Sequence, residues 1–446
     1  MKLKSVEIEN YRAIEHLVLP LDPSLTVLHG DNTCGKTSVL SAIAVGLSSI
    51  LEFFVNYSKV DFVETDVRTG ASFVQVAMTN SEGTSWKRKR LAGVRRRTAT
   101  RGRHALGRMM SRIADVEADD SIPMPVVTFY DTDRVGFNAP KGWKTRGSPI
   151  RRYASATAKE EMSLRLGGTP EFFRHLALEE ALTARTNFPE FFTWFYAKEN
   201  DELREQKQHH DFSYRRKDLS AVRRAIASML EGMSDPRVDV EPLRFSVSIT
   251  SAEKEVETLE LDQLSGGQRA VLALVADLAW RMALANPHLE DPLNSEAVVL
   301  IDEVELHLHP SWQQRILEDL RRTFPNTQFV VSTHSPQVLT TVKPEHVVEL
   351  AREDGRIVAG SAGGWTYGAE AGDVLAAVMG VSERPDNEFT RKLTDYSRLV
   401  SEGKGESSEG VALRETLESM SPEDPALARA DLEIRRRRLL KQMAKS

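Results

Sequence analysis

Runs of apolar residues at regular spacing predict a series of β-strands along the chain. Apolar and charged residues alternate over positions 3–9, and a second run, Leu25–Leu28, stops at His29-Gly30. Further strand patterns occupy residues 71–79, 124–130, 245–249, 297–301 and 328–332. The run 297–301 is apolar throughout, and the run 328–332 has an apolar centre between Gln328 and Ser332, as expected for strands that are buried on both faces of a parallel sheet.

Helical periodicity appears between these strands. It covers about 36–55, about 267–285 and about 311–323, so that the last helix joins two buried strands in a βαβ unit. Residues 150–232 are also helical in pattern, without heptads sustained long enough for a coiled-coil arm. Their aromatic residues, at 191, 192, 194, 195 and 196, are expected to pack in a helical core, which is commoner than a base-stacking platform.

The order of these elements predicts an α/β fold, with a mixed sheet flanked by helices, in four segments. We expect an N-terminal lobe over 1–149, a compact helical insertion over 150–235, a C-terminal lobe over 236–360 and a helical C-terminal region over 361–446. The last segment is rich in glycine at first and acidic later, and it ends in the basic run Arg435–Arg438.

The composition narrows the class of protein. The chain has 446 residues, of which 41% are hydrophobic and 28% charged, as in a folded globular protein. Its net charge of −6 provides no global positive field for nucleic acid or for an anionic membrane. The single cysteine, Cys34, excludes an intrachain disulfide, and no segment has the pattern of a signal peptide or a membrane span. We therefore expect a cytoplasmic protein without a membrane partner.

One segment departs from the acidic average. Residues 87–108 contain ten Lys or Arg and no Asp or Glu. We interpret this segment as a solvated basic loop in preference to a phosphate-binding one, which leaves nucleic acid open as a partner.

Residues Gly30–Thr37 match the phosphate-loop pattern G-x-x-x-x-G-K-[ST] between a strand and a helix. Glycines let backbone N–H groups close on phosphate oxygens, Lys36 can reach the β and γ phosphates, and Thr37 can offer its hydroxyl to Mg²⁺. The sequence therefore predicts a nucleotide site at the end of this strand.

Two acids follow the apolar strand 297–301. Asp302 can hold the Mg²⁺ shell, and Glu303 can polarise the water that attacks the γ phosphate. The next strand is followed by His334, which can contact the γ phosphate because the carboxyl ends of adjacent parallel strands meet at one crevice. A lone histidine is nevertheless more often structural.

The sequence Leu264–Gln268, LSGGQ, begins another predicted helix. Its glycines and Ser265 offer backbone and hydroxyl donors at the positive end of that helix, which gives a second phosphate-binding surface. One γ phosphate has no need of two such surfaces from a single chain.

These motifs, in this order, resemble those of the ABC-type ATPase superfamily, in its SMC/RecF-like branch. The resemblance implies an ABC-type P-loop head that hydrolyses ATP with Mg²⁺, in which the signature serine of one protomer closes on the ATP held by the other. It implies a homodimer of ATP-sandwiched heads, or a higher oligomer built from such dimers. It assigns catalysis to Glu303, Lys36 and His334, and metal binding to Thr37 and Asp302.

The resemblance also implies which residues contact the nucleotide. These are Arg12, Gly30, Asn32, Thr33, Cys34, Gly35, Lys36, Thr37, Ser38, Ser265, Gly266 and Gly267. Arg12 ends a segment that resembles the N-terminal stretch whose arginine lies near the nucleotide, and Asn32 matches the usual asparagine of the loop. Cys34 departs from the usual serine or glycine. Two places compete for the Q-loop, namely Gln75 and the stretch Tyr130–Arg134.

Within this branch the chain resembles PtuA-type ATPases of Septu and retron anti-phage systems. The stretches that support this are Phe191–Phe195, Asp302–Pro310, Thr333–Val338 and Val378–Pro385. LSGGQ departs from the acidic signature that these relatives often carry. The resemblance implies a sensor or scaffold ATPase that holds a separately encoded nuclease, such as an HNH protein, inactive while ATP is bound.

A RecF-like DNA-repair ATPase that clamps duplex DNA is the alternative function for this chain. A nuclease of the overcoming-lysogenization-defect type needs an Asp-x-Asp cluster on an apolar strand, which the sequence after residue 345 lacks. A transporter cassette fits less well, because 37 residues separate Ser265 from Asp302 and because the chain has a large helical insertion.

Overall fold

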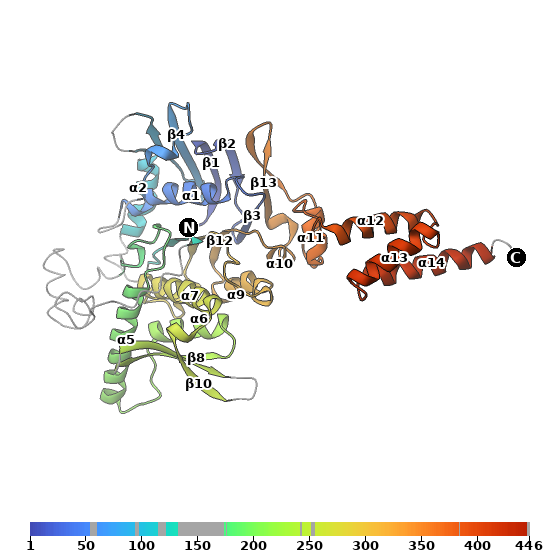
Figure 1. The fold of residues 1–446 in the computed structure, drawn as a ribbon. Coiled ribbons are helices and arrows are strands. Elements are labelled where there is room, and N and C mark those ends of the chain that lie inside the picture. The colour runs from blue at the N-terminus through green and yellow to red at the C-terminus, as the bar shows by residue number, and fades with distance from the viewer. Residues whose placement is uncertain are drawn as a thin grey trace. The chain divides into compact units, whose positions relative to one another are not determined.

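The computed structural model describes residues 1–53, 60–93, 98–114, 122–132, 174, 176–240, 243–250, 255–382 and 384–443. The chain separates into two compact units, Met1–Met379 and Gly380–Ser446 (Figure 1). Arg134 and most of the predicted insertion before residue 174 lie outside the described residues. The division into four segments at 149, 235 and 360 stays a prediction.

A six-stranded sheet forms the centre of the first unit. Its order is β14 (Arg356–Ser361), β13 (Val347–Glu353), β3 (Leu25–His29), β12 (Thr327–Ser332), β11 (Ala297–Ile301) and β7 (Val126–Tyr130). All neighbours pair in parallel except β13 and β14. The strands β3, β7, β11 and β12 are buried along their whole length, which explains why apolar residues dominate them. The predicted mixed sheet is confirmed.

A five-stranded antiparallel sheet packs above the first helix. Its order is β2 (Ile14–Pro20), β1 (Leu3–Tyr11), β4 (Phe73–Asn80), β5 (Ser85–Leu91) and β6 (Ala99–Arg101). Helix α1 (Lys36–Leu51) contacts β1, β4 and β5 on one side and β7, β11 and β12 on the other, so it lies between the two sheets (Figure 1). The sequence predicted this helix to about residue 55, and it ends at Leu51.

The interpretation of residues 87–108 as a solvated loop is wrong for the part that the structure describes. These residues form most of β5, all of β6 and the first half of helix α2 (Arg103–Ala114). Arg88 is fully buried, and its guanidinium donates to the carbonyl oxygens of Val45 and Val60 and to Asp61. The count of basic residues did not reveal this, because strand alternation turns every second side chain of β5 toward the interior.

Three helices and a small antiparallel sheet form another part of the first unit. Helices α6 (Lys217–Met229) and α7 (Gly266–Ala285) pack on each other, and α5 (Phe188–His209) contacts both. The antiparallel sheet has the order β10 (Val256–Glu260), β9 (Leu243–Thr250) and β8 (Met233–Val240). The predicted aromatic core is confirmed, since Phe188, Phe191 and Phe195 are buried around the ring of Phe245.

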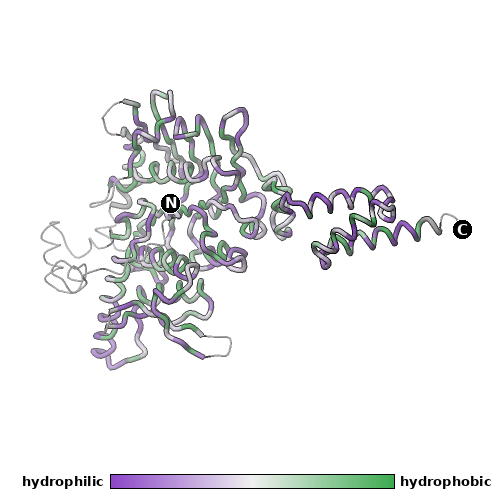
Figure 2. The backbone as a smooth tube through the Cα atoms, viewed as in Figure 1, coloured by the Kyte–Doolittle hydropathy of each residue, from purple (hydrophilic) through white to green (hydrophobic). Residues whose placement is uncertain are grey.

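Short elements complete the first unit. They are α8 (Pro310–Gln313), α9 (Ile316–Thr323), α10 (Pro336–Leu339), α11 (Ala371–Ala377) and the 3-10 turns Glu64–Asp66, Leu261–Gln263, Pro292–Asn294 and Pro344–His346. The helix predicted over 311–323 is therefore divided between α8 and α9. In Figure 2 long hydrophobic stretches follow the central strands and helices of this unit.

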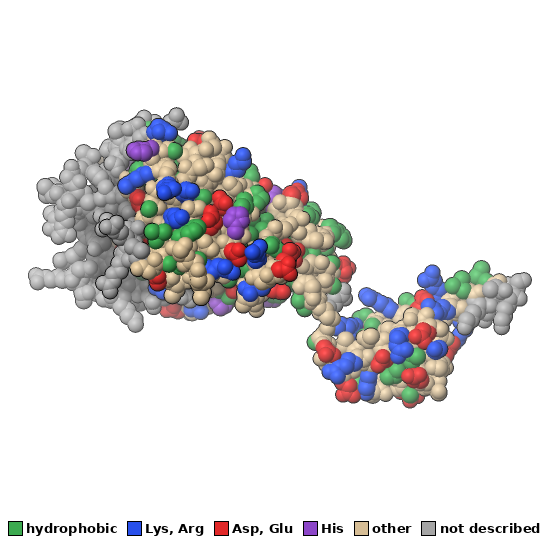
Figure 3. Space-filling view, turned by 90° about the horizontal axis from the view of Figure 1, so that it is seen from above, with side chains coloured by type: hydrophobic (Ala, Val, Ile, Leu, Met, Phe, Trp, Pro, Cys, Tyr) green, Lys and Arg blue, Asp and Glu red, His purple; other side chains and the backbone are tan. Residues whose placement is uncertain are grey.

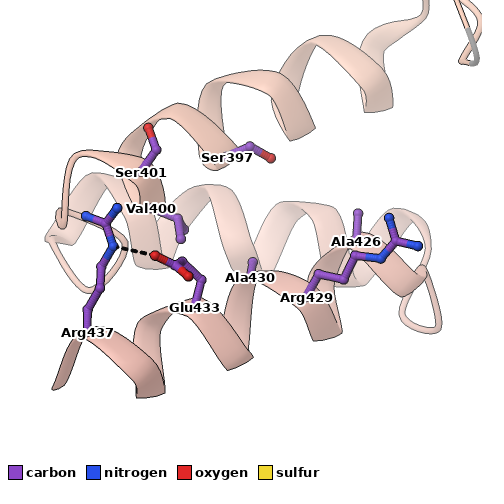
Figure 4. Close-up of a pocket in the computed structure, with 8 residues that line it drawn as sticks. All are labelled: Ser397, Val400, Ser401, Ala426, Arg429, Ala430, Glu433 and Arg437. Carbon is purple, nitrogen blue, oxygen red and sulfur yellow. Dashed lines mark hydrogen bonds and ion pairs between the residues drawn. The ribbon is translucent and has the colours of Figure 1, made fainter. Parts of the chain in front are cut away.

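The second unit consists of α12 (Glu388–Ser401), α13 (Ser408–Met420) and α14 (Pro425–Met443). Its small core includes Leu393, Tyr396, Val400 and Leu417. An open groove of about 350 Å³ lies between α12 and α14, and an ion pair between Glu433 and Arg437 lines it (Figure 4). Acidic and basic side chains are interspersed on the visible surface (Figure 3). Within the described residues, no helix has the length and hydropathy to span a membrane.

Candidate functional site: a nucleotide-binding edge of the sheet

The phosphate loop connects β3 to α1 at the carboxyl edge of the six-stranded sheet. Gly30 has φ 142°, and a Cβ atom built on it would lie 2.1 Å from the carbonyl oxygen of Leu350 in β13. A side chain at this position would therefore collide with the neighbouring backbone. Gly35 precedes α1 with φ 85°, and Thr33 also has a positive φ of 75°. The loop is thus held open by conformations that few residues adopt.

Lys36 places its charge inside this loop. The side chain is 6% exposed, and Nζ donates to the carbonyl oxygens of Gly30 at 2.7 Å and Asp31 at 3.0 Å. Burial lowers the pKa of Lys36, while the nearby carboxylates of Asp302 and Glu303 oppose the shift. An ammonium group that has lost much of its water is stabilised by an anionic ligand such as phosphate.

The carboxyl ends of β11 and β12 bring the two predicted acids to this loop. Thr37 Oγ1 donates to Asp302 Oδ2 at 2.6 Å, and the Ser332 hydroxyl donates to Asp302 Oδ1. Ser332 Oγ also accepts from the backbone N–H of Glu303 at 2.8 Å. Glu303 has a positive φ of 45°, a backbone conformation that residues other than glycine rarely adopt.

His334 follows β12 at the same edge and is half-buried. Its backbone N–H donates to Oε1 of Glu305 at 2.5 Å. The backbone N–H of Thr333 donates to the carbonyl oxygen of Leu28, and that of Val304 to the carbonyl oxygen of Ser332. These bonds bring the ends of β3, β11 and β12 together, as the sequence predicted.

The signature residues lie at the start of α7. Ser265 caps the helix, since its hydroxyl accepts from the backbone N–H of Gln268 at 3.2 Å while Oε1 of Gln268 accepts from the N–H of Ser265 at 2.9 Å. Ser265 and Gly266 are exposed in the chain, so their donor groups face outward. Gly267 lies against the loop after Glu303, because a Cβ atom there would be 2.7 Å from the carbonyl oxygen of His307.

Arg12 sits in the turn between β1 and β2. Its Nε donates to Asp66 Oδ1 at 2.9 Å, and 41% of the side chain is exposed. Ile14, two residues later, lies 3.7 Å from a Cβ atom built on Gly35, so this turn packs against the phosphate loop. Of the remaining loop residues, Asn32 and Thr33 are exposed, Ser38 is half-buried and Cys34 is buried.

The two Q-loop candidates take different places. Gln75 is in β4, and its Nε2 donates to Glu9 at 2.8 Å. Tyr130 ends β7 beside Asp302, and its hydroxyl donates to Asp277 Oδ2 at 2.8 Å. The structure does not bring both to the phosphate loop, and the position of the Q-loop stays a prediction.

The sequence patterns did not predict several residues at or near this edge. Ser332 holds both acids, and its only signal was its place as the last residue of the apolar run before His334. His29 is 1% exposed, and its Nε2 has no hydrogen-bond partner. Burial and the charge of Lys36 lower the pKa of His29 to about 4, so the imidazole is neutral at pH 7. Asp277 and Arg281 of α7 carried no sequence signal.

These side chains fit a magnesium nucleotide. Thr37 and Asp302 bring a hydroxyl and a carboxylate together, and such hard oxygen ligands suit Mg²⁺. Lys36, the backbone N–H groups of the loop and the amino end of the sixteen-residue helix α1 provide the positive surface for phosphates. The arrangement can therefore bind the phosphates of a nucleotide.

A known protein family matches most of this chain. Residues 2–358 match the family described as RecF/RecN/SMC N terminal domain. Because the match covers most of the chain, the protein belongs to this family, and the predicted ABC-type head is confirmed.

Three relatives refine the comparison. The Retron Ec83 probable ATPase of Escherichia coli is 26% identical over 501 aligned positions, which cover 98% of this chain and 87% of the relative. The Retron Vc95 probable ATPase of Vibrio cholerae is 25% identical, with coverage of 93% and 87%. The Septu protein PtuA of Bacillus mycoides is 29% identical over 32% of this chain and 19% of its own length. The chain is thus an SMC-like, nucleotide-binding ATPase related to retron and Septu proteins.

Proposed function

We propose that this protein hydrolyses ATP with Mg²⁺, that two of its heads close on ATP, and that this closure controls a separately encoded nuclease in anti-phage defence. The observation that carries the first part is the 2.6 Å hydrogen bond between Thr37 and Asp302, which joins the phosphate loop to the acid-bearing strand. Retron ATPase relatives that span nearly the whole chain support the link to defence.

Each side chain of the site has a role in this proposal. Lys36 exchanges the carbonyl oxygens of Gly30 and Asp31 for phosphate oxygens. Thr37 and Asp302 hold Mg²⁺, which when bound neutralises charge on the phosphates. Glu303 accepts a proton from the attacking water at its carboxylate, while Ser332 fixes the backbone of this residue.

The remaining site residues complete the proposed nucleotide pocket. His334 contacts the γ phosphate from the end of β12, while Arg12 and residues 32–35 and 38 surround the phosphates from the other side. The proximity of the β1–β2 turn to Gly35 supports the assignment of Arg12.

The proposed dimer uses the outward-facing signature. Ser265 and Gly266 are exposed at the positive end of a twenty-residue helix, where they can meet a γ phosphate held by a second copy. Each active site is then completed by the other protomer. Because ATP bridges the two heads, nucleotide binding and assembly are coupled.

The effector is the proposed consequence of this assembly. The ATP-closed dimer holds an HNH-type nuclease inactive, and hydrolysis or loss of ATP releases it. The family description includes RecF, so a clamp on duplex DNA is the competing outcome of the same assembly.

The test compares wild type, Glu303→Gln and the exposed control Glu345→Gln by light scattering with and without Mg-ATP. We expect Glu303→Gln to stay dimeric in Mg-ATP, since it binds but does not hydrolyse the nucleotide, while the control behaves as wild type. Co-purification with the neighbouring gene products then identifies what the dimer holds. Retention of duplex DNA in place of a nuclease would favour the clamp, and absence of ATP-dependent assembly would refute both functions.

A further inference from the structure

The signature helix is joined to the acid-bearing strand of its own chain at two points. The first is the close approach of Gly267 to the carbonyl oxygen of His307, in the loop that follows Glu303. The second lies farther along α7, at Asp277, twelve residues after Ser265. At a helical rise of 1.5 Å per residue, Ser265 and Asp277 are about 18 Å apart along the helix.

Asp277 is 1% exposed and accepts three hydrogen bonds from three parts of the chain. Its Oδ1 accepts from the backbone N–H of Asn187 at 2.9 Å. Its Oδ2 accepts from the Tyr130 hydroxyl at 2.8 Å and from Nε of Arg281 at 2.8 Å. A buried carboxylate with these partners has one defined position, because losing any of them would leave a charge poorly solvated.

Arg281 attaches this cluster to the segment before α5. The Arg281 side chain is 0% exposed, and its Nη1 donates to the carbonyl oxygens of Ala177 at 2.8 Å and Glu179 at 2.9 Å. The same segment bonds to the end of β7, since the N–H of Phe129 donates to the carbonyl oxygen of Ala181. The cluster is therefore built into packed elements and has no freedom to drift.

Tyr130 carries the connection to the proposed active site. It is the last residue of β7 and lies opposite Ile301 in the parallel register. Its carbonyl oxygen accepts from the backbone N–H of Asp302 at 2.8 Å. One residue thus binds the signature helix through its hydroxyl and the magnesium-binding acid through its backbone. Burial and the charge of Asp277 raise the pKa of Tyr130, so the hydroxyl keeps its proton and stays a donor.

We infer that Tyr130 and Asp277 are positioning residues that transmit the docking of the signature helix on a second copy to Asp302 and Glu303 of the same chain. This inference rests on the proposed ATP-closed dimer. When Ser265 engages the partner's nucleotide, any shift of α7 is carried to β7 and to the adjacent end of β11. Filling one composite site then shifts the acids of the other, which makes hydrolysis cooperative.

The test uses Tyr130→Phe, which removes one hydroxyl and keeps the ring. The matched control is Tyr396→Phe, a buried tyrosine in the separate C-terminal unit. For each variant we measure Kd for a fluorescent ATP analogue, kcat, the Hill coefficient for ATP and Tm. Tyr130→Phe should keep Kd within about twofold of wild type, lower kcat about tenfold and bring the Hill coefficient toward one. The control should leave Kd, kcat and the Hill coefficient unchanged.

A second variant guards against a purely structural effect. Asp277→Leu removes both acceptor oxygens at a similar side-chain volume, and the double variant with Tyr130→Phe should be no slower than Asp277→Leu alone, since both changes break the same bond. An unchanged kcat and Hill coefficient in Tyr130→Phe would refute this role, as would additive losses in the double variant. Wild type without ATPase activity would instead refute the proposed function, so the two failures are distinguishable.

Discussion

Gly266 and Gly267 offer a sharp test of how the signature helix is held, because they are adjacent glycines with different surroundings. A Cβ atom on Gly266 meets nothing within 4 Å. A Cβ atom on Gly267 would lie 2.7 Å from the carbonyl oxygen of His307 and 3.7 Å from the Cα atom of Leu308. Real Cβ atoms do not approach backbone oxygens so closely, so alanine at 267 must displace either the helix or the loop.

The two substitutions therefore differ in sign. Gly266→Ala should leave the free energy of unfolding unchanged or raise it by up to about 0.5 kcal/mol, because alanine restricts the unfolded chain more than glycine does. Gly267→Ala should lower it by about 1–3 kcal/mol, the usual cost of forcing extra volume into a packed contact. It should also lower kcat, because the displaced loop begins at Glu303.

The assay is thermal and urea unfolding of both variants beside wild type, followed by steady-state ATPase measurements. In a unit of this size, 1 kcal/mol corresponds to a Tm change of roughly 2 °C, so the predicted difference is measurable. Stability is the deciding measurement, because either alanine can hinder docking on a second copy. Equal unfolding free energies for Gly266→Ala and Gly267→Ala would refute the close approach of α7 to the His307 loop.

Three further predictions concern the site and its support. Thr37→Val removes the hydroxyl that donates to Asp302, so we expect kcat to fall at least tenfold and the Mg²⁺ concentration for half-maximal rate to rise, measured by ATPase titration. His29→Gln should flatten the pH dependence of stability. The imidazole protonates near 6.5 when unfolded and near 4 when folded, so the unfolded chain binds more protons in this range and wild type loses up to about 3 kcal/mol as the pH falls through it. Arg88→Met removes the buried donors to the carbonyl oxygens of Val45 and Val60 and the ion pair with Asp61, so it should lower stability by about 2–5 kcal/mol in thermal unfolding.

Each of these has its own control. Thr37→Ser keeps a hydroxyl and should retain most of the rate, so equal losses in both variants would contradict the role of the oxygen. His29→Gln should match wild type in slope above pH 6.5, and an unchanged slope between 6.5 and 4 would assign the titration to other groups. Lys87→Met, one residue before Arg88 on the opposite face of β5, should change stability by less than about 0.5 kcal/mol.

The sequence alone was sufficient for the central strands and for the position of the phosphate loop. Strands buried on both faces consist mainly of apolar residues, so residues 297–301 and the apolar centre of residues 328–332 stood out in the sequence. The phosphate loop is a local structure, in which the glycines, the lysine and the start of the following helix lie within eight consecutive residues. Acids placed directly after a buried strand can only lie at the edge of its sheet, so Asp302 was predictable as a partner of this loop.

Tertiary structure decided everything that depends on which surfaces meet. Composition marked residues 87–108 as a basic loop, yet packing of β5 on α1 buries Arg88 and satisfies it with backbone oxygens far away in the sequence. The pairing of Tyr130 with Asp277 joins residues 147 positions apart, and no local pattern encodes such a separation. Local motifs specify themselves through short-range hydrogen bonds, whereas long-range contacts are selected by the packing of the whole core, which a single sequence does not display.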